Sequence, residues 1–175
     1  DLGLNWDEGL EAGGPAEPYR QSQRLDIYRA HVQKLLDAGQ AYYAMESTQE
    51  LETMREAAAA RKEAFKYPRP AALPTSEQAQ AARDAGREVV VRFVCPAEDV
   101  TIQDDAFGSV TMPAAEIDDF IILKADGYPT YHLANVVDDA LMGVTYIMRG
   151  QEFLAQTWRH VLLRRALGFA EPGYC

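Results

Sequence analysis

Four polar side chains in the last third of the chain have types and spacing that suit the binding of a small charged molecule. Tyr131 and Asn135 are four residues apart in a segment of helical periodicity, and Arg149 and Glu152 follow a run rich in β-branched residues. Side chains four residues apart share one face of a helix, so Tyr131 and Asn135 would offer neutral hydrogen bonds side by side. A guanidinium can hold a carboxylate with two parallel hydrogen bonds. The set therefore suits a small, polar, anionic ligand.

The elements that must position these residues read as helix, strand and helix, a fragment of an α/β domain. Arg149 is the last residue of the predicted strand, and Glu152 opens the next helix. In an open α/β sheet, ligands bind outside the carboxyl ends of the strands, where free N–H groups at helix N-termini also point. The predicted segments are a turn at 126–127, a helix over 131–142, a buried strand over 144–149 and a long helix over 152–167 that ends at Gly168.

Purely structural roles compete for the same residues. An arginine at a strand end is more often an ion-pair partner than a ligand clamp, and Tyr131 and Asn135 would more often be a helix face with satisfied hydrogen bonds. Asp138 and Asp139 could suggest a metal site, but adjacent acids near a helix end are usually solvated or capping. From spacing alone, the structural reading is favoured over the ligand site.

The histidines and cysteines offer no clear catalytic set. His31, His132 and His160 are scattered along the chain, and no pair has the spacing of metal ligands. Cys95 has no catalytic partner nearby in the sequence, so a buried thiol is expected rather than a nucleophile.

The first two thirds of the chain alternate between helical and strand-like segments. Two capping patterns, Ser47 with Glu50 and Thr75 with Gln78, mark helix starts. The helix after Ser47 is polar over much of its surface, so it should project from the core. The predicted order is a loop over 1–17, a helix over 21–38, a strand over 41–45, a helix over 51–65, a proline-broken connector over 67–74, a short helix stopped by Gly86, and strands over 88–94, 99–104, 108–112 and 118–124.

Length and composition bound the class of protein. A chain of 175 residues can bury a core as one domain or two small ones. No apolar run approaches the length that crosses a bilayer, and the acidic, glycine-rich opening does not resemble a signal peptide. The missing initiator methionine suggests a piece of a longer protein. With only Cys95 and Cys175, a disulfide framework is not expected, and a reducing cytoplasm is the simplest setting.

The charge balance limits nucleic-acid binding to a local surface. The formal net charge is −10, from 27 acidic and 17 basic side chains. Phosphate contacts need positive potential, so a binder that uses its whole surface is disfavoured. The segment 61–69, with Arg87 and Arg92, supplies a local positive charge. A solvated helix end explains that segment equally well.

Several long segments closely resemble the bacterial-type glutamyl-tRNA synthetases, class I aminoacyl-tRNA synthetases of the glutamate and glutamine group. The resemblance runs nearly end to end and in family order. Its most specific parts are PYRQSQR and YPTYHLANVVDD. The others are DLGLNWDEG, DDFIILKADG, GVTYIMRGQEFL and LLRRALGF.

The resemblance implies ATP-dependent activation of L-glutamate to glutamyl-adenylate, followed by transfer to the acceptor end of tRNA(Glu). Tyr131, Asn135 and Arg149 match family positions that contact glutamate, and Glu152 and Phe153 match positions that line the ATP site. The implied chemistry needs positioning and charge stabilisation, with Mg²⁺ on the phosphates, and no protein nucleophile. No catalytic residue is therefore assigned within this chain. The full-length enzyme would be a monomer.

The implied fold is a partial Rossmann-like class I catalytic fold, interrupted by an inserted α+β domain that binds the tRNA acceptor stem. Residues 1–42 and 118–175 would form parts of the nucleotide-binding domain, and 43–117 the insertion. Both class I signature motifs would lie outside the chain, so the isolated chain is expected to be inactive. Many relatives carry zinc in the insertion, but Ala44 and Glu46 stand at the cysteine positions, so no zinc is expected.

Two other readings remain. A truncated paralogue glutamylates a modified base of tRNA(Asp), although it usually keeps the zinc cysteines and lacks the YPTYH form. The isolated chain could also be a non-catalytic module that binds the tRNA acceptor end. The glutaminyl enzyme fits less well, because it lacks the arginine at the position of Arg149. No residue of the insertion is assigned to tRNA contact.

Overall fold

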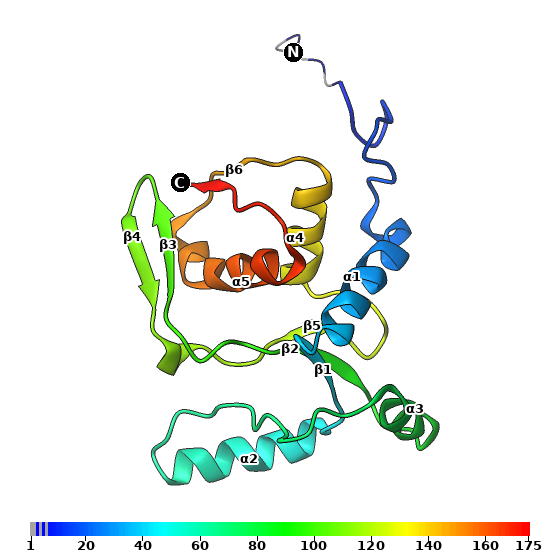
Figure 1. Cartoon of the computed structure of the whole chain (residues 1–175), viewed down its shortest axis with the longest axis vertical. Coiled ribbons are helices and arrows are strands. Elements are labelled where there is room, and N and C mark those ends of the chain that lie inside the picture. Colours follow the sequence, from blue (N-terminus) through cyan, green and yellow to red (C-terminus); the bar gives the residue numbers. More distant parts are fainter. Residues whose placement is uncertain (1–2, 4, 6) are drawn as a thin grey trace.

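The computed structural model describes residues 3, 5 and 7–175 and has a mixed α/β architecture (Figure 1). The predicted loop over 1–17 is confirmed where it is described, since 7–17 contain turns and an isolated bridge between Gly9 and Gly13 but no helix or strand. Residues 1, 2, 4 and 6 of that loop lie outside the described residues. Within the described part of the chain, no helix is long and apolar enough to cross a membrane.

The first long helix begins four residues later than its periodicity suggested. A 3₁₀ turn occupies Gln21–Gln23, and α1 spans Leu25–Asp37. Apolar side chains at helical spacing, Tyr28, Val32 and Leu35, are buried in the main core and almost inaccessible to solvent. Gly39 ends the helix with a φ of 67°, a left-handed conformation that costs glycine little.

A three-stranded antiparallel sheet connects segments that lie far apart in the sequence. Its strands, in spatial order, are β1 (Ala41–Ala44), β2 (Val90–Phe93) and β5 (Ile121–Leu123). Tyr42 pairs with Arg92, and Val91 pairs with Leu123. The predicted boundary at residue 43 therefore falls inside β1, and β2 joins the predicted insertion to the segments on both sides of it.

Both predicted capping boxes are present. Ser47 caps α2 (Thr48–Ala60), and Thr75 caps α3 (Ser76–Asp84). The α2 helix buries only Ala58 and lies apart from α4 and α5, so the predicted projection is confirmed (Figure 1). It stops at Ala60, short of the predicted residue 65, because Lys62 adopts a left-handed φ of 59°.

A hairpin stands beside the C-terminal helix (Figure 1). It consists of β3 (Val100–Asp104) and β4 (Gly108–Met112), as the period-two pattern predicted. Val100 and Ile102 are buried in the same core as Trp158 of α5. The backbone N–H of Asp105 donates to the carbonyl of Tyr174, which attaches the hairpin turn to the last strand.

The last third of the chain is a β–α–β unit preceded by a helix. Parallel pairing requires a crossover, and here a 3₁₀ segment followed by a helix supplies it. Apolar side chains of the two long helices, among them Leu133, Val137, Val161 and Leu163, complete the core. The elements are α4 (Tyr131–Leu141), β6 (Tyr146–Ile147), a 3₁₀ helix (Gln151–Gln156), α5 (Thr157–Leu167) and β7 (Gly173–Tyr174).

Two sequence predictions for this region were wrong. The buried strand expected over 144–149 is only two residues long and largely exposed, and among the described residues β6 pairs with β7 alone. The long helix expected from Glu152 starts as a 3₁₀ helix and becomes α-helical at Thr157. Its predicted end is confirmed, since Gly168 has a φ of 72°.

Candidate functional site

A pocket of about 400 Å³ lies between α4, the segment after β6 and the start of α5. It brings together four of the five residues that the sequence singled out, although these are spread over two helices and a loop. Glu152 is exposed and is not part of the lining. The lining residues are Tyr131, Asn135, Ile147, Met148, Arg149, Gly150, Phe153, Gln156, Thr157 and His160.

Arg149 is both an ion-pair partner and a residue of the pocket wall. Its Nη1 donates to Asp104 Oδ2 at 2.7 Å, and its Nε donates to Thr157 Oγ1 at 2.8 Å. The Arg149 side chain is 10% exposed and that of Asp104 is fully buried. The guanidinium holds the pKa of the Asp104 carboxyl below its usual range. The ion-pair role that spacing favoured is therefore confirmed, and it coexists with a place in the pocket.

One nitrogen of the Arg149 guanidinium is unpaired in the part of the chain that the structure describes. Nη2 is buried and makes no hydrogen bond within the described residues. Buried N–H groups are almost always paired, so an orphan of this kind calls for a specific explanation. The backbone of Arg149 is fixed as well, because its N–H donates to the carbonyl of Cys175, continuing the β6–β7 ladder. A rigidly held guanidinium with an unsatisfied nitrogen is suited to bind an anion that enters the pocket.

Sequence spacing failed to reveal a histidine pair beside this pocket. His132 Nδ1 and His160 Nε2 lie 3.1 Å apart, and Tyr131 packs edge-on against both rings. Burial lowers the pKa of each imidazole to about 4, and for His160 the neighbouring His132 and arginines add to the effect. The two rings are therefore neutral at pH 7. They meet because α4 packs on α5, a contact whose register the sequence does not specify.

The adjacent acids on α4 are neither solvated nor capping, contrary to the sequence prediction. Asp138 accepts hydrogen bonds from Arg24 at 2.7 Å and from the Tyr28 hydroxyl at 2.6 Å. Asp139 pairs with Arg164 at 3.3 Å. Both arginine side chains are 2% exposed, so the acids neutralise buried cations of α5 and of the segment before α1. A role in metal binding finds no support, because no group of three or more His, Cys, Asp or Glu side chains gathers anywhere in the described residues.

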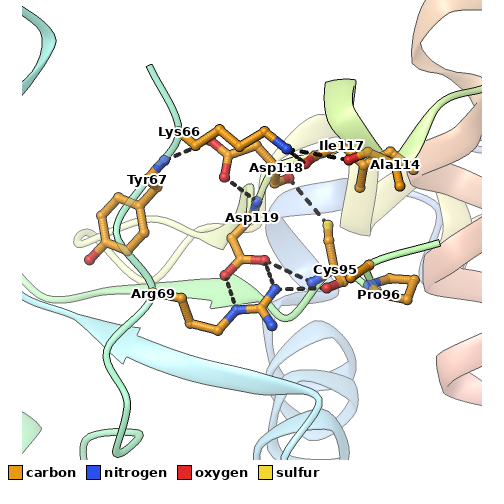
Figure 2. A pocket seen from close by; sticks show the side chains of 10 residues that line it. Lys66, Tyr67, Arg69, Cys95, Pro96, Ala114, Ile117, Asp118 and Asp119 are labelled. Carbon is orange, nitrogen blue, oxygen red and sulfur yellow. Dashed lines mark hydrogen bonds and ion pairs between the residues drawn. The ribbon is translucent and has the colours of Figure 1, made fainter. Parts of the chain in front are cut away.

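A second, smaller pocket surrounds Asp119, just before β5 (Figure 2). Figure 2 shows the Asp119 carboxylate between the Arg69 guanidinium and the backbone N–H of Cys95, and all three are joined by hydrogen bonds. The Lys66 ammonium donates to two backbone carbonyls across the cavity. Cys95 is buried, which confirms the predicted buried thiol, and its burial raises the pKa of the thiol to about 12. Because its polar groups are paired with one another, this pocket has a structural role.

The positions that would carry zinc cysteines lie beside an aromatic and charged cluster. Ala44 is buried, and the Glu46 carboxylate accepts a hydrogen bond from the Tyr67 hydroxyl. The Arg92 guanidinium lies 3.7 Å from the centre of the Tyr67 ring. Cation–π contacts of this kind stabilise a desolvated arginine.

The basic surface expected around 61–69 is partly neutralised within the chain, where Arg61 and Arg69 pair with acids. Arg92 is only 9% exposed and donates to a backbone carbonyl, so it is not available to a nucleic acid, contrary to the prediction. Arg87 pairs with Glu50 at 2.7 Å and Arg61 with Glu63 at 2.7 Å. The charges counted from the sequence overstate the positive potential of this surface.

The chain matches a known family of proteins over its whole length. The whole chain, residues 1–175, matches the family described as "tRNA synthetases class I (E and Q), catalytic domain". Two solved structures share the fold at 33% identity and a TM-score of 0.85. They are a glutamate–tRNA synthetase from Elizabethkingia anophelis, which covers 99% of this chain, and a glutamate–tRNA ligase from Elizabethkingia meningosepticum in complex with its amino acid, which covers 97%. The chain aligns with 37% and 35% of those two structures.

The chain belongs to the catalytic-domain family of class I aminoacyl-tRNA synthetases for glutamate and glutamine. Among curated relatives, it is 49% identical to the glutamate–tRNA ligase of Arthrobacter sp. strain FB24 over 95% of its length. It is also 45% identical to the glutamate–tRNA ligase of Marinomonas sp. strain MWYL1, and that match covers 99% of this chain. It spans only about a third of the length of these relatives, 33% and 36% respectively.

Proposed function

We propose that this chain forms the amino-acid pocket of an enzyme that ligates L-glutamate to tRNA(Glu). The observation that carries the proposal is the Arg149 guanidinium, which is locked in the wall of a 400 Å³ pocket with one nitrogen unsatisfied. No aspartate or glutamate lines that pocket among the described residues, and the Asp104 carboxylate that contacts Arg149 is buried and paired with Nη1. The names of the relatives supply the identity of the amino acid.

In this proposal Arg149 holds a carboxylate of glutamate by charge, while Tyr131 and Asn135 supply neutral hydrogen bonds. Because Nη2 is covered in the free chain, binding requires a small movement of the pocket wall. The neutral imidazole of His160 adds no further positive charge to the site. An oxygen of the α-carboxylate then forms a bond to the α-phosphorus of ATP as pyrophosphate leaves. A ribose hydroxyl of the tRNA next takes the glutamyl group and releases AMP.

Phe153 and Glu152 are proposed for the ATP side of the site. Phe153 is 42% exposed in the pocket wall and offers an apolar surface, whereas Glu152 lies outside the lining at the start of the 3₁₀ helix. The described residues contain no acidic cluster that fits a resident metal, so Mg²⁺ would arrive with the phosphates of ATP. When bound, the ion would supply charge neutralisation on the phosphate oxygens.

The division into domains is part of the same proposal. Residues 1–42 and 118–175 are assigned to the nucleotide-binding domain and 43–117 to an insertion that meets the tRNA acceptor end. The β1–β2–β5 sheet would connect the nucleotide-binding domain to the insertion. We assign no residue to tRNA contact, because half of the basic side chains of the insertion, Arg55, Arg61, Arg69 and Arg87, are paired with acids and Arg92 is buried. A monomeric enzyme in a reducing cytoplasm is the setting that we propose.

The test uses the full-length enzyme that contains this chain. Glutamate-dependent exchange of pyrophosphate into ATP is expected, followed by attachment of glutamate to tRNA(Glu). Periodate oxidation of the tRNA destroys the terminal ribose diol, so it should abolish attachment. Attachment of glutamate to tRNA(Asp) and not to tRNA(Glu) would instead identify modification of a base and overturn the proposal.

The isolated chain of 175 residues provides a matched comparison. It should show no exchange, because the phosphate-binding motifs expected from the family resemblance would lie outside it. Exchange by the isolated chain at a rate comparable to that of the full-length enzyme would contradict the assignment of these residues to the amino-acid pocket alone.

A further inference from the structure

The turn of the β3–β4 hairpin holds a buried carboxylate in one orientation. Asp104 is the last residue of β3, and its Oδ1 accepts hydrogen bonds from the backbone N–H groups of Ala106 and Phe107, both at 2.9 Å. These two bonds fix the plane of the carboxylate and direct Oδ2 to Arg149 Nη1. The side chain of Asp104 is fully buried, so water does not compete for either oxygen.

Three contacts then define the position of the Arg149 guanidinium. Asp104 binds Nη1, Thr157 binds Nε, and the guanidinium carbon lies 5.2 Å from the centre of the Tyr174 ring. The Thr157 hydroxyl donates in turn to the Phe153 carbonyl at 3.0 Å, so its own orientation is set by the 3₁₀ segment. Because a guanidinium is planar, fixing two of its nitrogens fixes the third. The unpartnered Nη2 is thereby held in one place.

We infer that Asp104 is a positioning residue of the amino-acid site: it fixes Arg149 so that Nη2 meets the carboxylate of the substrate. The inference rests on the proposed function and assigns to the hairpin a part in binding glutamate. Asp104 lies 45 residues from Arg149 in sequence, and the two meet because the hairpin packs on α5 and bonds to β7. Arg92 and Arg164 also leave one nitrogen unpaired among the described residues, but of these three arginines only Arg149 lines this pocket.

The decisive variant is Asp104→Asn in the full-length enzyme. The amide oxygen can still accept from Ala106 and Phe107, but the amide nitrogen would then face Arg149 Nη1, donor against donor. The guanidinium should turn away, and the KM for glutamate should rise roughly 10- to 100-fold, the range expected for a charge-assisted hydrogen bond. The KM for ATP should stay largely unchanged. Thr157→Val, which removes the partner of Nε at nearly constant volume, should act in the same direction.

Asp105→Asn is the matched control, since it removes the same charge in the same turn from an exposed side chain that contacts Tyr146 and not Arg149. It should leave both KM values at the wild-type level. If Asp104→Asn lowers the melting temperature but leaves the KM for glutamate unchanged, the ion pair is structural and the inference is wrong. If the wild-type enzyme itself fails to use glutamate, the proposed function fails and the inference falls with it.

Discussion

His132 Nδ1 lies 3.1 Å from His160 Nε2, and the two rings form a buried, neutral pair between α4 and α5. Only one of the two nitrogens can carry the shared hydrogen, so protonation of both rings would place two donors and two charges in contact. Burial is the main cause of the low pKa of both, about 4 each. The pair therefore favours folding only while both rings stay neutral.

We expect the stability of the chain to fall as the pH drops from about 6.5, the value for an unfolded histidine, towards about 4. In that window the unfolded chain binds more protons than the folded one, so acid favours unfolding. Each histidine can add at most about 1.4 kcal/mol per pH unit to this loss. Urea titrations at several pH values should show a flatter profile in the double variant His132→Gln and His160→Gln. An unchanged slope in that variant would exclude the pair as the source.

Asp138→Ala should destabilise the chain strongly. It leaves the Arg24 guanidinium, 2% exposed, without its charged partner, and it removes the acceptor of the Tyr28 hydroxyl. Loss of one partner of a buried ion pair typically costs about 3–5 kcal/mol. Urea unfolding measures the difference. Asp26→Ala is the control, because its pairing with Arg29 is exposed to solvent, and it should change little. Equal effects of the two substitutions would contradict the assigned role of Asp138.

Chelation should leave the stability of the insertion unchanged. Where relatives are expected to carry zinc cysteines, this chain has Ala44 and the contacts of Glu46 with Tyr67. Metal analysis of the purified chain should find no stoichiometric zinc, and EDTA should not shift the melting temperature. Tyr67→Ala, by contrast, should cost about 3–5 kcal/mol by opening a cavity under Arg92. One tightly bound zinc per chain would overturn this reading of the insertion.

The sequence predicted those elements whose signals are local. The capping boxes at Ser47 and Thr75, the hairpin strands and the glycine that ends α5 all depend on residues within one or two turns. The lengths of short strands were less predictable, because a strand depends on pairing with a segment that is distant in the sequence, as β6 pairs with β7, and not on its own β propensity alone.

The sequence predicted some of the residues that line the candidate site, but not the contacts that hold them in place. Residue type and spacing singled out Tyr131, Asn135, Arg149 and Glu152, and family resemblance added Phe153; all of them except Glu152 line one pocket. Spacing could not reveal that Asp104 pairs with Arg149, since no local pattern connects a hairpin turn with a distant loop. The partners of Asp138 and the histidine pair were missed for the same reason, because each depends on tertiary packing.

The most direct measurement of the central claim is the use of glutamate by the Arg149→Lys variant of the full-length enzyme. An alanine would leave the buried Asp104 carboxylate unpaired and confuse binding with folding, whereas lysine keeps a charge for Asp104 and removes Nη2. We expect kcat/KM for glutamate to fall roughly 10- to 100-fold. The KM for ATP and the melting temperature should change little. A stable variant with wild-type kcat and KM for glutamate would contradict the account and remove Arg149 from the amino-acid site.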